Sequence, residues 1–364
     1  MLSISWVTPT WFIDVDALVV PELAKTFVIH WTIVGRDKPT DYCKLEEQAS
    51  ETLQVDFVQM KSRWFFPTSF FEYIRFFRNI VDAGADIIYI DMAPQLYAFY
   101  ASLLTLPKEK TVFAAHNVKT PKGAKMESFA RYYMGKLLNS FQNFQVFSHN
   151  QLEYLNERVS GKNVLLAPLT LKEYGPKTQR NQNLDCVNFL SFGHIRHYKR
   201  IDLLIEAAQQ LYEECKERFV VTIAGNCPGW VEYASLIRYP DLFNLEIGFI
   251  GNDEVAQLFS NADYLVLPYQ DLAQSGAITV AFNYNVPVIT SDIPQFLEFV
   301  EDGINGFVFH SEDVKSLKEV MKKALSLQKN DYGRLVQSTS DYVRKNYSLQ
   351  SITERYVEYF KRLL

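Results

Sequence analysis

Short apolar runs alternate with helical patterns along the first half of the chain. The runs are rich in β-branched and aromatic residues and predict buried strands. They lie at 2–7, 27–34, 87–90, 111–115, 144–147 and 164–167. Helical spacing of apolar residues between them predicts helices at 14–24, 69–82, 95–104, 126–140 and 150–157. Alternating strands and helices predict a mostly parallel sheet covered by helices on both faces.

The same alternation restarts after a polar stretch at 171–186, which carries Gly175-Pro176 and is interpreted as a linker. The predicted strands beyond it are 187–192, 219–224, 245–250, 263–267, 286–290 and 307–309. The predicted helices are 199–214, 231–237, 254–260, 276–284, 294–301, 312–327, 331–345 and 349–363. We therefore expect two α/β domains, at 1–170 and 187–345, and a closing helical segment at 346–364.

Composition narrows the class of protein. A chain of 364 residues suits two domains, and 48% apolar with 22% charged residues is typical of a soluble globular protein. The net charge of −5 argues against a general nucleic-acid binder, which needs a basic field. No apolar run reaches the roughly 18 residues of a membrane span, so a cytoplasmic protein is expected. The four cysteines form no CxxC pair and are interpreted as reduced, buried thiols.

The most informative stretch, FLSFGHIRHYKRIDLLIEAA at 189–208, combines a strand, a glycine turn and an amphipathic helix. Gly193 lets the chain turn off the strand. Arg196 can form paired hydrogen bonds to phosphate oxygens, and Lys199 can supply a point charge. Solvated surface charges are the alternative, but cations at a helix start are mildly unfavourable, which favours a function. We expect both side chains to stabilise a leaving diphosphate.

A second possible anion cradle lies at Gln274-Ser275-Gly276, after the strand at 263–267. Ser275 suits an N-cap, and the free backbone N–H groups behind it can bind an anion. A plain capped helix explains this segment equally well. Asn226 and Gly251 also follow predicted strands, where a nucleoside could lie; ordinary turn residues are the alternative for each.

In the first half, His116 and Asn117 follow the strand at 111–115, and Asp91 follows the strand at 87–90. His116 is a candidate to bind a sugar hydroxyl or the reacting phosphate, with a structural histidine as the open alternative. Asp91 is a candidate for a hydroxyl contact or a base. Ligands of such sheets bind beyond the carboxyl ends of the strands, so the expected site lies in the cleft between the two domains.

Aromatic and basic residues interleave at 64–77 and 122–138. One predicted helical face is read as a core face, with Tyr73 and Phe76 lying off it. Its members are Phe70, Phe71, Ile74, Phe77 and Val81. A membrane-surface patch for a lipid-linked acceptor is the alternative.

These motifs resemble the retaining family-four glycosyltransferases of the GT-B fold. FGHIRHYKRIDLLIEA is similar to the family's glycine–basic–lysine phosphate motif, and VPVITSDIPQFLEFVEDGINGFVF is similar to the stretch after its donor helix, with Glu298 in register. FAAHN resembles the first-domain strand ending in His, and ITERYVEYFKRLL the final helix. The family's paired glutamates are replaced by Leu272 and Val280, as in a branch that reads Gln-Ser-Gly here, and its glycine-rich first loop is replaced by 7–11.

The resemblance implies a fold of two facing Rossmann-like, doubly wound parallel-sheet domains, with a C-terminal helix that crosses back to the first domain. It implies a retaining, metal-independent, hexosyltransferase-type enzyme that moves a sugar from a nucleotide-diphosphate donor to a glycan or lipid-linked hydroxyl acceptor. Surface polysaccharide or glycolipid synthesis is the expected setting. No cofactor is expected, because the nucleotide-sugar is a substrate. The one DxD match, Asp14-Val15-Asp16, is interpreted as incidental.

The expected roles follow from the motifs and the resemblance together. Catalytic roles are expected for His116, Arg196 and Lys199, and weaker acceptor-side roles for Asp91 and Asn117. Donor contacts are expected from Gly193, Asn226, Gly251, Gln274, Ser275, Gly276 and Glu298. Two alternatives stay open: a GT-B sugar-nucleotide epimerase, and a non-catalytic nucleotide-sugar-binding partner subunit. We expect a cytoplasmic protein, and peripheral contact with the inner face of the membrane also stays open.

Overall fold

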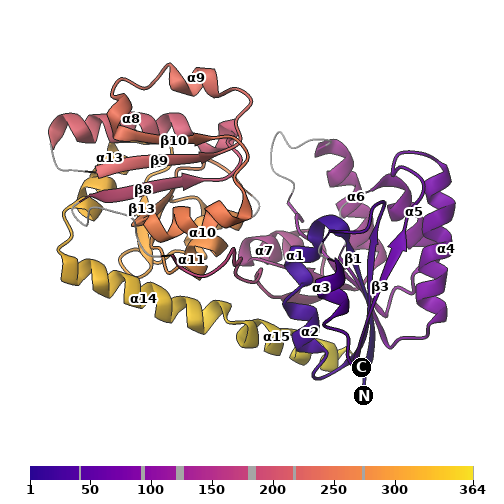
Figure 1. Ribbon diagram of the computed structural model, residues 1–364. Coiled ribbons are helices and arrows are strands. Elements are labelled where there is room, and N and C mark those ends of the chain that lie inside the picture. The colour runs from indigo at the N-terminus through magenta and orange to yellow at the C-terminus, as the bar shows by residue number, and fades with distance from the viewer. Residues whose placement is uncertain are drawn as a thin grey trace. The chain divides into compact units, whose positions relative to one another are not determined.

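In the computed structural model the chain divides into two compact units (Figure 1). Unit 1 comprises Met1–Thr170 and Tyr347–Leu364, and unit 2 comprises Leu171–Asn346. The structure describes residues 1–40, 42–91, 95–119, 127–178, 186–215, 219–272 and 275–363. Each unit is a parallel sheet between helices, which confirms the predicted fold class of two Rossmann-like domains.

Unit 1 is built on a seven-stranded parallel sheet in the order β3-β2-β1-β4-β5-β6-β7. Its strands are β1 (Ser3–Pro9), β2 (Val28–Gly35), β3 (Leu53–Gln59), β4 (Ile87–Ile90), β5 (Thr111–Ala114), β6 (Asn143–Val146) and β7 (Asn163–Leu166). The apolar pattern predicts all of them except β3. This strand lies at the sheet edge and most of its residues are half-buried or exposed, so its sequence LQVDFVQ contains no continuous apolar run.

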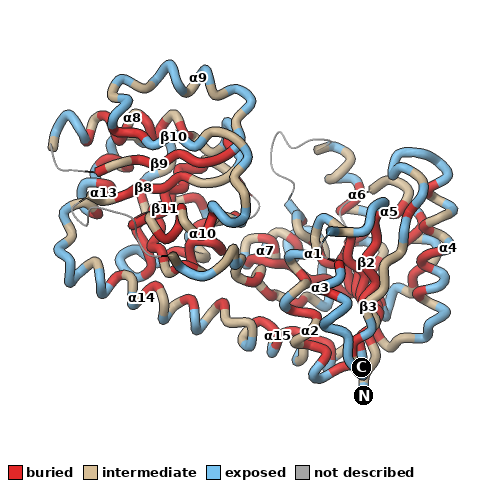
Figure 2. Tube along the Cα trace, in the orientation of Figure 1, coloured by how far each residue is buried: buried red, intermediate tan, exposed pale blue. Residues whose placement is uncertain are grey.

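Two hydrophobic cores cover the two faces of this sheet, because successive side chains of a strand point to opposite faces. Val7 and Val34 face the core that contains α4 (Thr68–Asp82), α5 (Leu96–Thr105), α6 (Glu127–Ser140) and α7 (His149–Arg158). Trp6 and Ile33 face the core that contains α2 (Val19–Leu23), α3 (Tyr42–Glu46) and α15 (Leu349–Arg362). Figure 2 shows the buried strands between helices whose outer sides are exposed.

Two details of the predicted helices are wrong. The pattern at 14–24 forms two short helices, α1 (Ile13–Asp16) and α2, instead of one. The predicted core face of α4 is also rotated: Tyr73 and Phe76 are buried, whereas Phe71 is 69% exposed. The many aromatic residues on this helix make several faces look apolar, and packing against the sheet selects only one of them.

Helix α15 belongs to unit 1, although it comes last in the chain. Tyr356 and Phe360 are buried in the same core as Trp6 and Tyr89. The Tyr356 hydroxyl accepts a hydrogen bond of 2.6 Å from the side-chain amide of Gln145 on β6. The expected return of the C-terminal helix to the first domain is therefore confirmed.

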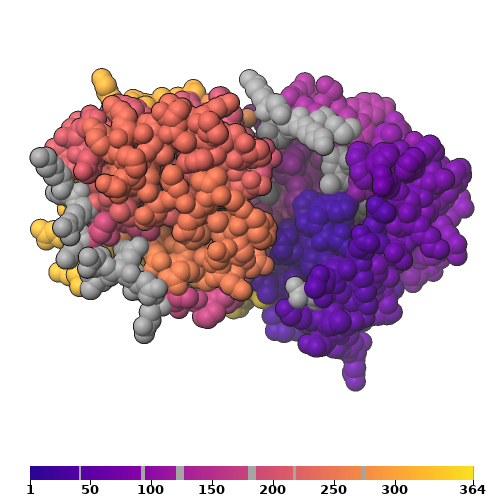
Figure 3. Space-filling model, turned by 45° about the horizontal axis from the view of Figure 1, so that its top comes forward, coloured from indigo at the N-terminus to yellow at the C-terminus, as the bar shows by residue number. Residues whose placement is uncertain are grey.

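Unit 2 is a six-stranded parallel sheet in the order β10-β9-β8-β11-β12-β13. Its strands are β8 (Val187–Phe192), β9 (Phe219–Gly225), β10 (Phe243–Ile247), β11 (Tyr264–Leu267), β12 (Val288–Ser291) and β13 (Gly306–Phe309). Its helices are η2 (His197–Lys199), α8 (Ile201–Glu214), α9 (Trp230–Ala234), η3 (Pro240–Leu242), α10 (Asn252–Asn261), α11 (Gly276–Asn283), α12 (Pro294–Leu297), α13 (Val314–Leu325) and α14 (Lys329–Tyr347). Figure 3 shows this unit in space-filling form, its visible face built largely from the orange part of the chain.

Three further expectations differ from the structure. Strand β10 ends at Ile247, so residues 248–251 form a loop. Helix α12 is a single turn, shorter than the predicted 294–301. Cys43 is exposed and the other three cysteines are only half-buried. Within the described residues, no helix combines the length and apolarity needed to cross a membrane.

The backbones after β8 and β9 approach each other closely. Gly193 has φ 102° and donates its N–H to Ala224 O at 2.9 Å. Gly225 has φ 143°, and a Cβ at this position would lie 2.3 Å from Gly193 O. Glycine is therefore required at position 225 both by the space available and by the backbone conformation.

We expect Gly225→Ala to destabilise unit 2 by at least about 2 kcal/mol, because the new methyl group collides with a backbone carbonyl at a strained φ. Gly333→Ala is the matched control: Gly333 lies exposed in α14 with no atom within 4 Å of its added Cβ. There the same change should stabilise by about 0.5–1 kcal/mol through helix propensity. Urea unfolding followed by circular dichroism measures both, and equal effects would contradict the steric argument.

Candidate functional site

In unit 2 the loops at the carboxyl ends of the central strands are joined by backbone hydrogen bonds. Ile195 N donates to Asn226 O at 2.9 Å, which ties the loop after β8 to the loop after β9. Gln270 N donates to Tyr198 O at 2.9 Å, which ties η2 to the loop after β11. β8 and β11 are neighbours at the point where the strand order reverses, and this is where open α/β sheets bind ligands.

Lys199 lies at the centre of these loops. A Cβ added to Gly193 would be 3.2 Å from Lys199 Nζ, so the amine lies directly against the glycine turn. The same nitrogen is 5.1 Å from the centroid of the buried Tyr269 ring, a cation–π arrangement. Tyr198 packs edge-on against Tyr269, with ring centroids 5.9 Å apart. The glycine turn and the two aromatic rings therefore hold the lysine in place.

The charges of this region separate into paired and unpaired groups. Arg200 is bound by Asp202 and Glu312, each with a closest contact of 2.9 Å, so its charge is compensated within the protein. In the part of the chain that the structure describes, no hydrogen bond or ion pair to an acidic side chain compensates Arg196 or Lys199. Burial, and then the charge of Arg196, lower the pKa of Lys199 to about 8. Two neighbouring cations without a counter-charge favour the binding of an anion.

The second expected anion cradle is only partly described. Gln274 lies outside the described residues. Ser275 occupies the N-cap position of α11 but makes no capping hydrogen bond, and its hydroxyl oxygen is buried without a partner among the described residues. Gly276 is the first residue of α11 and is exposed, and no atom lies within 4 Å of a Cβ added at this position. The prediction that backbone N–H groups here bind an anion stays a prediction.

The other expected donor residues lie in different surroundings. Asn226 is exposed and uses its carbonyl to hold the β8 loop. Gly251 is the N-cap of α10, and its N–H donates to Glu254 Oε2 at 2.6 Å, which is a structural role. Glu298 is half-buried at the C-cap of α12. Leu272 and Val280, at the positions of the family's glutamates, are both buried.

The sequence patterns do not single out Phe249, which lies in the loop after β10 with 88% of its surface exposed. This loop is tied to the site loops, because Gly248 N donates to Gly225 O at 3.2 Å. An aromatic residue between Gly248 and Gly251, just after a strand, is the signal that could have pointed to it. Exposed aromatic rings at such an edge can stack on a nucleobase.

In unit 1 the structure brings together two of the expected residues. His116 follows β5 and Asp91 follows β4, and these strands are neighbours in the sheet. His116 Nε2 and Asp91 Oδ1 are 2.5 Å apart. Asp91 is completely buried, so its carboxylate contacts His116 and does not reach the surface. Asn117 is exposed.

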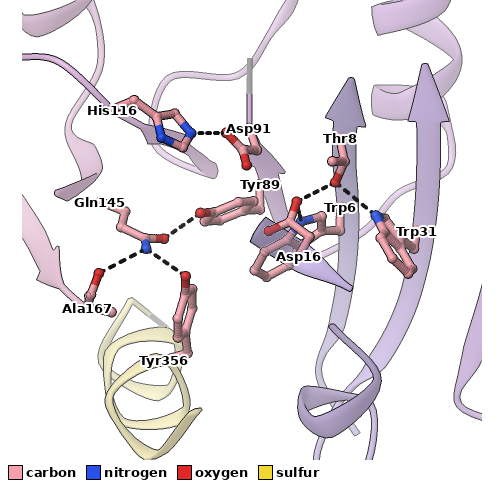
Figure 4. Close-up of polar contacts among 10 residues, drawn as sticks. All are labelled: Trp6, Thr8, Asp16, Trp31, Tyr89, Asp91, His116, Gln145, Ala167 and Tyr356. Atoms are coloured by element: carbon pink, nitrogen blue, oxygen red, sulfur yellow. Dashed lines mark hydrogen bonds and ion pairs between the residues drawn. The ribbon is translucent and has the colours of Figure 1, made fainter. Parts of the chain in front are cut away.

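A second buried carboxyl group, on Asp16 of α1, lies near this pair (Figure 4). Asp16 Oδ2 accepts hydrogen bonds from Trp6 Nε1 at 2.9 Å and from Thr8 Oγ1. Burial, and then the charge of Asp91, raise the pKa of Asp16 well above its usual range. The DxD match thus contains a buried carboxyl group held by the core. Among the described residues, no group of three or more His, Cys, Asp or Glu could hold a metal ion.

Residues 177–342 match the family model described as glycosyl transferases group 1. The matched residues lie entirely within unit 2. An uncharacterized glycosyltransferase of Methanocaldococcus jannaschii is 24% identical over 181 residues, which cover 47% of this chain and 44% of that protein. The chain thus spans less than half the length of this relative.

Solved structures resemble the whole chain. A glycosyltransferase from Rickettsia africae superposes with a TM-score of 0.74 at 16% identity, covering 100% of this chain and 98% of that one. HepE of Anabaena, solved in complex with UDP-glucose, superposes with a TM-score of 0.72 at 12% identity, covering 100% of both chains. At these identities the likeness establishes the fold, and it confirms the expected GT-B architecture around the group 1 domain.

We expect the binding of UDP to weaken about tenfold as the pH rises from about 7 to about 9. Lys199, with a pKa of about 8, loses its proton in this window and with it a charged contact. The phosphates are already ionised at pH 7. Lys199→Arg stays charged throughout and should give a nearly flat profile. Isothermal titration calorimetry measures both, and a flat profile for the unsubstituted protein would exclude Lys199 as a ligand.

Proposed function

We propose that this protein is a retaining glycosyltransferase that transfers a sugar from a nucleotide-diphosphate donor to a hydroxyl group. The observation that carries the proposal is the uncompensated pair Arg196 and Lys199 at the carboxyl ends of β8 and β11. The group 1 domain match and the UDP-glucose complex of HepE support a nucleotide-sugar as donor. The donor is a substrate, and the proposal includes neither a cofactor nor a metal ion.

In the proposed reaction, unit 2 stabilises the diphosphate leaving group. As the bond between the anomeric carbon and the diphosphate oxygen breaks, its electron pair passes to the diphosphate. Arg196 and Lys199 stabilise the negative charge that develops there. The acceptor oxygen forms the new bond on the same face of the sugar, and its proton passes to an oxygen of the leaving diphosphate. Backbone N–H groups near Ser275 and Gly276 assist the leaving diphosphate, and Phe249 stacks on the base.

Unit 1 supplies the groups proposed to act on the sugar and on the acceptor. His116 orients the sugar or the donor phosphate, and the exposed Asn117 contacts the acceptor. Asp91 is buried and bound to His116, so we propose that it acts on the substrate through His116 and does not contact it directly. The acceptor is proposed to be a glycan or a lipid-linked glycan of a cell-surface polysaccharide or glycolipid.

The two alternatives differ from a transferase in what they do to the donor. A sugar-nucleotide epimerase would convert the donor without any acceptor. A binding subunit would hold the nucleotide tightly and convert nothing. Chromatography of the donor with and without an acceptor mixture separates them: only a transferase releases nucleoside diphosphate and a glycosylated acceptor together.

We expect one of UDP, GDP, dTDP, CDP and ADP to raise the melting temperature of the purified protein, with NAD as a negative control. A ligand that binds only the native state at about 100 times its Kd stabilises it by about 2.7 kcal/mol, which a thermal-shift assay detects easily. The double variant Arg196→Ala/Lys199→Ala should lose the shift, because the diphosphate would then lack its counter-charges.

The matched control for this panel is Lys329→Ala/Lys345→Ala, which removes two exposed lysines of α14 and therefore the same charge. It should keep the full shift. Absence of a shift with every nucleotide would count against the proposed donor site. If the nucleotide still raises the melting temperature of the Arg196→Ala/Lys199→Ala variant, the phosphates must bind elsewhere in the protein.

We also propose peripheral contact between unit 1 and an anionic membrane. Trp64, Phe65 and Phe66 are 44%, 49% and 48% exposed, and Phe71 at the start of α4 is 69% exposed. Three exposed arginines are nearby in the sequence: Arg63, Arg75 and Arg78. Aromatic rings that insert at the interface and cations that attract anionic headgroups form together a membrane-surface patch.

We expect the protein to float with vesicles that contain about one-third anionic lipid and to stay in the lower fraction with neutral vesicles. Trp64→Ser/Phe65→Ser/Phe66→Ser should abolish flotation, because it removes the inserting rings. Tyr212→Ser, at a 42% exposed position of unit 2, is the control and should float normally. Equal recovery with and without anionic lipid would remove this proposal.

A further inference from the structure

The His116 ring is held on three sides. Phe12 stacks on the ring at a centroid distance of 4.2 Å, and Phe147 stacks at 4.5 Å, each with an interplanar angle of 18°. The ring edge is bound through Nε2 to Asp91 Oδ1 at 2.5 Å. Two stacked rings fix the plane of the imidazole, and the carboxylate fixes its rotation within that plane. Nδ1 has no hydrogen-bond partner among the described residues.

Asp91 is an unusual partner for His116 because its side chain is completely buried and only one of its two carboxylate oxygens has a hydrogen-bond partner among the described residues. One of its carboxylate oxygens contacts His116, and the other has no hydrogen-bond partner within the described ranges. A buried carboxylate is costly unless it is paired. The observed geometry therefore makes the contact with His116 the principal compensation for the Asp91 charge.

Asp16 adds a second buried carboxyl group, 1% exposed, which is bound to side chains of β1, the neighbour of β4 in the sheet. Its hydrogen bonds identify the atom that carries a proton. Trp31 Nε1 donates to Thr8 Oγ1 at 2.8 Å, which leaves the Thr8 hydroxyl to donate onward to Asp16 Oδ2. Trp6 Nε1 donates to the same oxygen. Oδ2 thus accepts two hydrogen bonds. If Asp16 is protonated, its proton is therefore on the other oxygen, Oδ1.

Two buried carboxyl groups within electrostatic reach do not both ionise readily. Burial and the charge of Asp91 both favour the protonated form of Asp16. His116 contacts Asp91, whereas Asp16 accepts hydrogen bonds from Trp6 and Thr8. The environments of the two groups therefore differ.

We propose that Asp91 is a positioning residue that holds His116 with Nε2–H turned toward its carboxylate and Nδ1 left as a hydrogen-bond acceptor, while Asp16 stays protonated. A carboxylate that accepts from one ring nitrogen sets the tautomer of the imidazole. The outer nitrogen then accepts a hydrogen bond from a hydroxyl group, and a sugar hydroxyl is the substrate group that the proposed function supplies. This last step rests on the proposed function; the tautomer and the Asp16 proton do not.

The test is nitrogen-15 NMR of protein labelled at histidine, recorded at about pH 8.5, where an ordinary imidazole is neutral. The His116 signals are those missing from the spectrum of His116→Gln. We expect the Nε2–H tautomer. In Asp91→Asn the amide can donate to Nε2, so the proton should move to Nδ1. Asp16→Asn replaces a neutral acid by a neutral isostere, which still accepts from Trp6 and Thr8, and should leave the tautomer unchanged.

A carbon-13 spectrum of protein labelled at the aspartate carboxyl groups reports on Asp16, whose signal is the one missing from Asp16→Asn. We expect the protonated form at about pH 7. Three results would overturn the inference: His116 protonated on Nδ1 in the unsubstituted protein, an unchanged tautomer in Asp91→Asn, or an ionised Asp16. Melting temperatures of the variants establish that each one is folded.

Activity gives an independent measure. Asp91→Asn should lower donor turnover about 10- to 100-fold and leave the Kd for nucleoside diphosphate unchanged, because the phosphate-binding groups are in unit 2. Asp16→Asn should retain turnover within about twofold. Failure of the proposed function would appear as absent nucleotide binding with the NMR result intact, whereas failure of this inference would appear as a wrong tautomer in a protein that still binds nucleotide.

Discussion

The close approach of two backbone turns is the constraint on which the unit 2 site depends. Where the chain leaves β8, Gly193 faces Gly225 at the end of β9, with no space for a side chain between them. The turn that results brings the Lys199 amine back against Gly193, and the Tyr198 carbonyl receives a hydrogen bond from the loop after β11. Glycine at these positions therefore does more than end strands. It sets the geometry in which a lysine is half-buried with no acidic partner among the described residues, and the loss of solvent around its amine lowers its pKa.

Both units contain neighbouring ionisable groups whose surroundings differ. In unit 2, Arg200 is compensated by Asp202 and Glu312, whereas no acidic side chain among the described residues compensates Lys199 or Arg196. In unit 1 the proposal assigns the proton to Asp16 and the charge to Asp91. Each contrast arises between groups that are close in space, so it follows from specific partners rather than from the overall charge of the region. In unit 2, structural ion pairs account for Arg200, and the proposed donor site gives a role to Arg196 and Lys199.

The sequence predicted the fold class, the return of the final helix and most strands, because strands buried on both faces appear as continuous apolar runs. Strand β3 was not predicted because an edge strand with half-buried residues has no such run. The buried face of α4 was predicted wrongly because its aromatic residues are spread around the helix. The basic pair was predictable from its place after a strand and a glycine. The link between Asp91 and His116 was not, because residues 25 positions apart in the chain meet only through strand pairing. Phe249 lacked a periodic signal altogether.

Helix α15 has a consequence for the order in which the chain folds. The residues of unit 2 form one continuous segment, whereas unit 1 needs both ends of the chain, and the bond between Gln145 and Tyr356 joins residues 211 positions apart. During synthesis, unit 2 has all its strands before the ribosome reaches α15, while the core around Trp6 and Tyr89 still lacks two aromatic side chains. Unit 1 is therefore completed last, and closing its long loop costs less entropy once unit 2 has become compact.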